Sequence, residues 1–203
     1  MSFVIRHRFN GRAGYLHHNF VVAVLNDLFG VQSRGGCSCA GPYGHRLLGI
    51  DLETSHAFQS SITHGCEGIK PGWTRLNFNY FISDAVCDYL IEAVHLVAQH
   101  GWKLLPDYRF EPASGLWHHR AAAPEPPLTL AAVHYDASGS LAYPHAHPQA
   151  DESALPGYLE QARTLFASLP DEPTWRDDEP TGLDPEAEEL RWFPLPAICV
   201  SPA

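Results

Sequence analysis

The stretch from Gly30 to Gly44 reads GVQSRGGCSCAGPYG and carries the strongest local signals in the chain. It holds five glycines, two cysteines and one arginine. Glycine permits positive φ angles and close approach of the backbone, so such a loop can wrap around a ligand. A nearby guanidinium favours the thiolate form of a cysteine. The local chemistry leaves two interpretations open: a reactive cysteine loop, or a tight turn with a buried thiol.

The residues before this loop predict a helix and a short strand. Apolar residues recur at spacings of one, three and four between Leu16 and Leu28, and Gly30 suits the helix end. Val31–Arg34 is then expected as a short strand that delivers the cysteines. His17 and His18 lie near the helix start, where we expect ordinary polar first-turn residues rather than ligands.

The residues after the loop predict a second strand and a second helix. Trp73–Phe81 alternates, with Thr74, Leu76, Phe78 and Tyr80 forming one apolar face, and this predicts a strand. Arg75 then points away from the apolar face, toward a ligand cleft or toward solvent. Ser83 is a good N-cap, and an apolar stripe predicts a helix over Asp84–His100.

These segments resemble the C-terminal small domain of class V aminotransferase-like enzymes. Arg34-Gly35-Gly36-Cys37-Ser38-Cys39-Ala40 is similar to the R-x-G-x-x-C-A loop of the cysteine desulfurase and selenocysteine lyase branch. Gly72–Tyr80 resembles the family strand whose arginine binds the substrate carboxylate, and Asp84–His100 resembles the last family helix. The resemblance covers roughly residues 2–105.

The resemblance implies a fold and a set of site residues. The fold would be α/β, of the α+β small-domain kind, with a small and mostly antiparallel sheet and helices packed on one face, as in fold type I transferases. Cys39 would accept sulfur as a persulfide, and Arg75 and Arg34 would bind an amino-acid substrate. The cofactor would be pyridoxal 5′-phosphate, held by a large domain that this chain does not resemble.

Lysine is nearly absent, which bears on that cofactor. A pyridoxal-phosphate enzyme holds its cofactor as a Schiff base with a lysine. Only Lys70 and Lys103 occur, and both are expected to be exposed turn residues. The isolated chain is therefore expected to bind no cofactor. We expect a fragment, a split subunit or a truncated frame, completed by a partner chain that carries the large domain or by a homodimer.

Departures from the family pattern keep other interpretations open. Cys37 and Ser38 stand where this branch usually has histidines. The whole enzyme could be a desulfurase, an aminotransferase-like lyase or an epimerase-like relative. The alternative from a different class is a non-catalytic, stand-alone interaction module that retains the fold.

The rest of the chain divides by composition. Residues 1–120 are expected to form the class V-like domain, ending in a strand over Lys103–Phe110 and a hairpin partner at Leu116–Arg120. Residues 121–169 are expected as an extension with one strand, within Leu128–Tyr135, and one helix, over Pro156–Leu169. Residues 170–203 read as an acidic, Pro-rich tail, and its apolar segment at Leu190–Pro196 is expected to dock on a surface that the sequence does not identify.

Charge and cysteine content limit which partners and which cell compartment are expected. Residues 151–203 hold 3 Lys and Arg against 12 Asp and Glu, whereas residues 1–150 are nearly balanced, with 10 against 11. An acidic balance argues against nucleic-acid binding. No apolar run is long enough to span a membrane, and five cysteines do not suggest a disulfide framework. A cytoplasmic location is expected.

Thirteen histidines and five cysteines raise the question of a metal. The spacing Cys37-x-Cys39 is tighter than the usual zinc hairpin, and no second pair follows at zinc-finger spacing. His118-His119 and His145-Ala146-His147 stand in a hairpin and a loop. We therefore assign no metal ligands.

Overall fold

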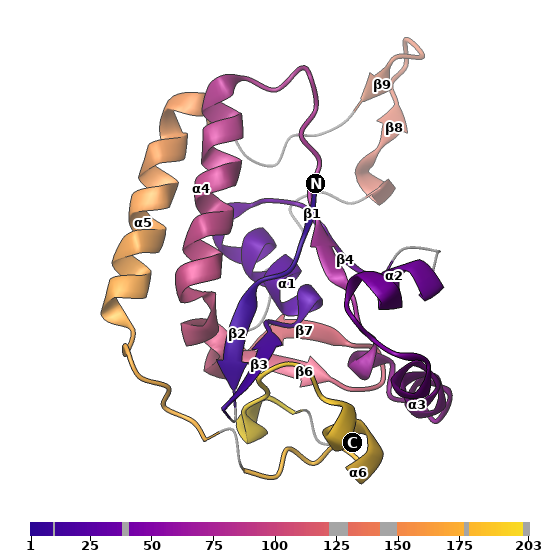
Figure 1. Cartoon of the computed structure of the whole chain (residues 1–203). Helices are drawn as coiled ribbons and strands as arrows, with labels where there is room; N and C mark the ends of the chain where they lie inside the picture. The colour runs from indigo at the N-terminus through magenta and orange to yellow at the C-terminus, as the bar shows by residue number, and fades with distance from the viewer. Residues whose placement is uncertain (10, 38–40, 122–129, 143–149, 177–178, 201–203) are drawn as a thin grey trace.

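The fold is mixed, with small antiparallel sheets and helices packed around one apolar core (Figure 1). A computed structural model describes residues 1–9, 11–37, 41–121, 130–142, 150–176 and 179–200. The α+β class expected from the sequence is confirmed. The helices are α1 (His18–Phe29), α2 (Gly41–Leu47), α3 (Leu52–Thr63), α4 (Asp84–His100), α5 (Leu155–Ser168) and α6 (Pro185–Leu190).

The strands form one three-stranded sheet and several hairpins. The sheet has the order β1-β5-β4, from Ser2–Phe3, Trp73–Arg75 and Arg34–Gly36, and both pairings are antiparallel. The hairpins are β2 (Arg6–Phe9) with β3 (Arg12–Tyr15), β6 (Tyr108–Glu111) with β7 (Leu116–His119), and β8 (His134–Tyr135) with β9 (Leu141–Ala142).

Only the first three residues of the strand expected over Trp73–Phe81 form a strand, and the prediction is wrong after Arg75. β5 ends at Arg75, beside neighbours β1 and β4 that are only two and three residues long, and one more pair of backbone hydrogen bonds joins Leu76 to Met1 at 2.9 and 2.7 Å. Leu76 is still buried, as the alternation predicts, but Tyr80 and Phe81 are 99% and 72% exposed. The strand expected at Val31–Arg34 also lies slightly later, at Arg34–Gly36.

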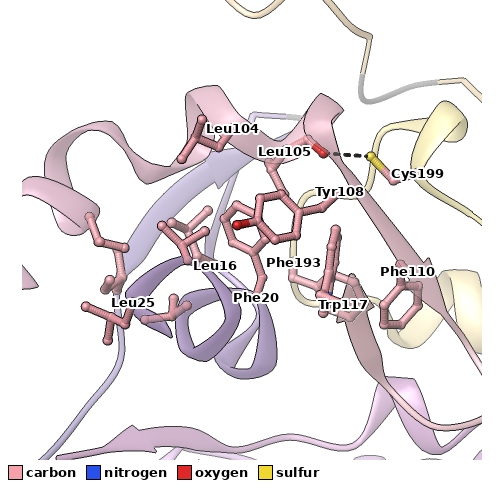
Figure 2. Packing of buried hydrophobic residues seen from close by; sticks show 14 of the residues in the cluster. Leu16, Phe20, Leu25, Leu104, Leu105, Tyr108, Phe110, Trp117, Phe193 and Cys199 are labelled. Atoms are coloured by element: carbon pink, nitrogen blue, oxygen red, sulfur yellow. Dashed lines mark hydrogen bonds between the residues drawn. The ribbon is translucent and has the colours of Figure 1, made fainter. Parts of the chain in front are cut away.

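Helix α1 lies in the centre of the core, as its apolar spacing predicts. Phe20, Val24 and Leu25 are fully buried, and Gly30 ends the helix with φ of 64°. Figure 2 shows how the hairpin β6–β7 packs on it: the Phe20 ring meets Tyr108 edge-on at 5.3 Å between centroids. The hairpin was expected, but the residues before it form a 3₁₀ helix, Gly101–Asp107, where two adjacent buried leucines suit a helical turn better than a strand.

Helices α4 and α5 lie side by side along one flank of the molecule (Figure 1). Helix α4 has the predicted bounds and the predicted Ser83 cap, whose hydroxyl accepts a hydrogen bond from Val86 N–H at 3.1 Å. The expected exposure of Lys103 is wrong. Its side chain is only 6% exposed, and its ammonium donates to the carbonyls of Phe166 and Leu169 at the end of α5 and pairs with Asp171 at 2.7 Å.

The last residues of the chain complete the core. Phe193, Leu195 and Cys199 are fully buried, so the apolar segment that is expected to dock packs on this chain itself. Arg191 is buried with them and pairs with Glu188 at 2.6 Å. Within 121–169, α5 confirms the expected helix, and the expected strand is reduced to the two residues of β8.

Candidate functional site

Two arginines lie side by side on the exposed face of the three-stranded sheet. Arg34 of β4 is the register partner of Arg75 of β5. Residues directly opposite each other in an antiparallel pair project from the same face, with Cβ atoms about 4.5–5.5 Å apart. Both side chains are exposed, whereas Thr74 is buried on the opposite face. The sheet therefore brings together the two substrate-binding residues expected from the sequence, which are 41 positions apart.

The opposite face of this sheet rests directly on helix α1. Thr74 Oγ1 donates to the carbonyl of His18 at 3.3 Å. A Cβ at Gly35 would collide with the side chain of Asn19, and one at Gly72 would lie 2.6 Å from the backbone of Gly36. Glycine at these two positions lets the loop approach the helix and fixes the plane from which both arginines project.

The two guanidiniums take part in none of the ion pairs found among the described residues. Cys37 and Trp73 line the same small depression as the two arginines. Two neighbouring guanidiniums provide several N–H donors in planar forks, which match the geometry of a carboxylate. Chemically, this face suits a small anion.

The described cysteines are either half-buried, as Cys37 and Cys87 are, or buried, as Cys66 and Cys199 are. Cys39, expected to carry sulfur, lies outside the described residues. Cys37 is half-buried at the edge of the arginine face. Cys199 donates its S–H to the carbonyl of Leu105 at 3.1 Å, and burial raises its pKa to about 12. Burial also raises the pKa of the Cys66 thiol. Neither of these two thiols suits nucleophilic chemistry.

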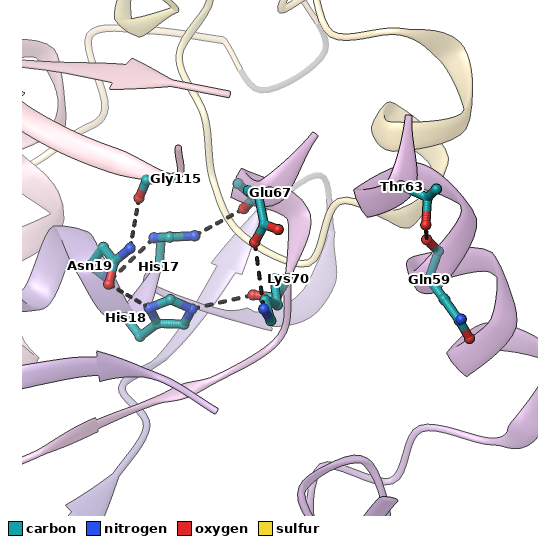
Figure 3. Close-up of polar contacts among 9 residues, drawn as sticks. His17, His18, Asn19, Gln59, Thr63, Glu67, Lys70 and Gly115 are labelled. Carbon is teal, nitrogen blue, oxygen red and sulfur yellow. Dashed lines mark hydrogen bonds and ion pairs between the residues drawn. The ribbon is translucent and has the colours of Figure 1, made fainter. Parts of the chain in front are cut away.

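Two histidines lie buried beneath the arginine face, and this was not foreseen. His17 and His18 are 1% and 6% exposed, so their interpretation as ordinary polar first-turn residues is wrong. Figure 3 shows both rings among their polar neighbours, which include Asn19 and Lys70. His17 Nε2 donates to the carbonyl of Gly68 at 3.0 Å. Its Nδ1 accepts from the N–H of Asn19 at 3.2 Å and from the indole N–H of Trp117 at 3.1 Å. This pattern satisfies a neutral ring.

His18 lies between two oxygen atoms. Its Nε2 is 3.2 Å from the carbonyl oxygen of Lys70, and its Nδ1 is 2.9 Å from Asn19 Oδ1. The amide of Asn19 donates in turn to the carbonyl of Gly115 at 2.8 Å (Figure 3). Burial lowers the pKa of both histidines, most strongly that of His17, which also faces His18. The network ties α1 to the turn before β5 and thereby supports the arginine face from below.

Both lysines are held in ion pairs. Lys103 is enclosed by the end of α5, and Lys70 is an exposed residue paired with Glu67 at 3.5 Å. In the part of the chain that the structure describes, no group of three or more His, Cys, Asp or Glu side chains could hold a metal ion. The same residues contain no helix with the length and apolarity needed to cross a membrane.

Comparisons with known proteins add no relative: no protein-family model, no curated protein and no solved structure matches the chain.

Proposed function

We propose that this chain is the substrate-recognition part of a class V aminotransferase-like, pyridoxal-phosphate-dependent enzyme that acts on an amino acid. The observation that supports this most directly is the pairing of Arg34 with Arg75 on an open sheet face beside Cys37. Arg75 is assigned to hold the substrate carboxylate, with Arg34 beside it. A guanidinium can bind both carboxylate oxygens in a fixed plane and so orient the α-carbon.

The chain's own residues do not fit the cofactor. Pyridoxal phosphate supplies an electron sink for carbanion chemistry and requires a lysine. Lys103 is already bonded to two carbonyls and a carboxylate, and Lys70 belongs to an exposed turn. We therefore place the cofactor on a large domain of a separate chain. Desulfurase, lyase and epimerase-like activities remain alternatives within this proposal.

A second candidate is a non-catalytic interaction module. Tyr80 and Phe81 favour it, since these adjacent and largely exposed aromatic rings meet edge-on at 5.4 Å between centroids. Exposed aromatic residues are enriched at protein interfaces. Turnover of an amino acid after addition of a large domain distinguishes the two candidates.

The test is to co-produce the chain with a large-domain chain that carries a Ser/Gly-His-Lys segment, encoded by a neighbouring reading frame, and to compare Arg75→Lys with the parent. Loss of a bidentate, charge-assisted contact should lower kcat/KM roughly ten- to a hundredfold, or about 1.5–3 kcal/mol. Stability should change little, because the side chain is exposed.

Arg12→Lys is the matched control, because Arg12 is also an exposed strand arginine but belongs to the β2–β3 hairpin. It should keep parental kcat/KM. Full activity of Arg75→Lys toward an amino acid would remove Arg75 as the carboxylate anchor. Failure of every large-domain chain to restore turnover would favour the interaction module.

A further inference from the structure

A second cavity lies away from the arginine face, between helices α3 and α6. Its volume is about 580 Å³, and we call it the α3–α6 pocket. Its apolar walls come from three separate segments: Tyr15 at the end of β3, Phe58 of α3, and Leu190 and Trp192 at and after the end of α6. Cavities of roughly 300–1,000 Å³ with mostly apolar walls are typical of small-ligand sites.

The charged residues that line this pocket are all acidic. Asp51 and Glu53 stand at the start of α3, and Glu186 and Glu189 stand on α6. No lysine, arginine or histidine is among the residues that line it. Glu53, Glu186 and Glu189 are exposed, and none of them takes part in an ion pair found among the described residues.

Basic residues stand next to the pocket but do not line it: His45, Arg46 and Lys70 line an adjoining cavity that shares Asp51 and Phe58 with it. Arg191 follows α6 directly, but it is buried and bound to Glu188 and to the carbonyl of Phe193. Asp51 caps α3 by accepting from Thr54 N–H at 2.8 Å. That bond lowers the pKa of Asp51, so its carboxylate stays ionised at neutral pH. An apolar cavity whose own charged lining residues are all acidic complements a ligand with an apolar body and a positive charge.

We propose that the α3–α6 pocket binds a small organic cation, an alkylammonium or alkyldiamine whose carbon chain packs on the aromatic wall and whose ammonium groups face the rim. Tyr15 and Trp192 have their ring centroids 6.5 Å apart and contribute π faces that attract cations. The proposal does not depend on the enzyme assignment, because none of the residues that line this pocket lines the depression between Arg34 and Arg75.

The test compares three probes with the same carbon chain: hexane-1,6-diamine, hexylamine and hexan-1-ol. Binding to the full chain is measured by calorimetry and by NMR shift mapping at neutral pH and low salt. We expect affinity to fall in that order, with roughly a tenfold or larger difference between the diamine and the alcohol. Raising the salt concentration should weaken binding of the diamine and leave binding of the alcohol unchanged.

Neutralising the acidic residues of the rim distinguishes the contribution of charge to binding from that of the shape of the pocket. In the triple variant Glu53→Gln, Glu186→Gln, Glu189→Gln, the affinity for the diamine should fall at least about tenfold, and the affinity for hexan-1-ol should be unchanged. The control triple, Asp88→Asn, Glu172→Gln, Glu179→Gln, removes the same charge from exposed carboxylates that do not line the pocket and should bind the diamine as the parent does. Thermal unfolding checks that each variant is folded.

A cavity-filling variant keeps the test decisive if the rim variant unfolds. Ala57 of α3 lines the pocket, and Ala57→Phe would occupy its volume without altering a charge. We expect diamine binding to be lost in that variant. The proposal is overturned if the diamine and the alcohol bind equally well, if the control triple loses as much affinity as the rim triple, or if Ala57→Phe binds the diamine normally.

Discussion

The arginine face and the α3–α6 pocket are opposite in charge and differ in size. Arg34 and Arg75 project from an exposed sheet face, and the depression between them is small. The pocket is lined by β3, α3 and the C-terminal segment, and its rim is acidic. A ligand on a shallow cationic surface stays in contact with water unless a second surface covers it. Under the proposed function, that second surface is the large domain, whereas the ligand proposed for the pocket needs no second chain.

The two regions also depend on different parts of the chain. The arginine face is made by β4 and β5, which lie between residues 34 and 75 and rest on α1. The pocket needs the segment after residue 184, which returns to pair with β3, where Tyr15 N–H donates to the carbonyl of Trp192 at 3.2 Å. Damage to the C-terminal segment should therefore affect the pocket first.

The largest expected effect comes from Phe193→Ala. The Phe193 side chain is fully buried and packs edge-on against His17 at 4.6 Å between ring centroids. Truncating a buried phenylalanine typically costs about 3–5 kcal/mol through lost burial and a residual cavity. We expect a large drop in the urea midpoint and loss of diamine binding in the pocket.

Ile198→Ala is the matched control for this prediction, because Ile198 belongs to the same segment but is 59% exposed. It should change the free energy of unfolding by less than about 0.5 kcal/mol. If Phe193→Ala is no less stable than Ile198→Ala, the C-terminal segment does not hold the pocket wall, and the comparison between the two regions fails.

Much of the fold can be predicted from the sequence because its signals are local. The bounds of α4 follow from Ser83 and an apolar stripe that ends before Gly101. The hairpin follows from two alternating segments that flank a turn. The end of β5 cannot be predicted in this way. Whether a strand continues beyond Arg75 depends on the lengths of its ladder partners, which lie about 40 and 70 positions away in the chain.

The candidate site is predictable to a similar and limited extent. Alternation places Arg75 opposite Thr74 and Leu76, and the loop motif points to Arg34. No local sequence pattern predicts that His17 and His18 are buried, since two polar residues at a helix start are usually solvated. Their burial depends on Trp192 and Phe193, which stack on and pack against them from the far end of the chain. The sequence marks Leu190–Pro196 as an apolar segment that docks, but it does not indicate that the segment packs on these histidines.

The buried histidines allow a test that affects both regions together. His17 and His18 have folded-state pKa values below the ordinary value of 6.5. Between that value and the folded pKa, the unfolded chain binds more protons than the folded chain, so stability falls as pH falls. We expect their contribution to be complete above about pH 6.5 and to decline progressively below it. Thermal unfolding recorded from pH 7.5 to 5 measures the slope.

His18→Gln removes one of the two titrating groups and should flatten the slope, while His95→Gln, at an exposed position of α4, should leave it as in the parent. Depressed carboxylate pKa values, as at Asp51 and Asp171, act only below their ordinary value of 3.8 and so lie outside this pH range. Stability that rises as the pH falls from 7 to 5 would show that the histidines are not held neutral.

The smallest expected effect tests whether the arginine pair is maintained at a cost to stability. Arg34 and Arg75 carry like charges at directly opposite positions of an antiparallel pair, an arrangement that is destabilising. Arg34→Gln should therefore raise the free energy of unfolding by about 0.2–1 kcal/mol at low salt, and less at high salt. Arg12→Gln is the control, because the residue opposite Arg12 is Phe9 and no like charge is relieved. Urea unfolding of both variants at two salt concentrations measures the difference.

A gain in stability at Arg34 alone, lost in high salt, is the result expected for residues that serve a ligand rather than the fold. A lower free energy of unfolding for Arg34→Gln would mean that the Arg34 guanidinium stabilises the sheet. Arg75 would then be the one arginine of this face to which a ligand role is assigned.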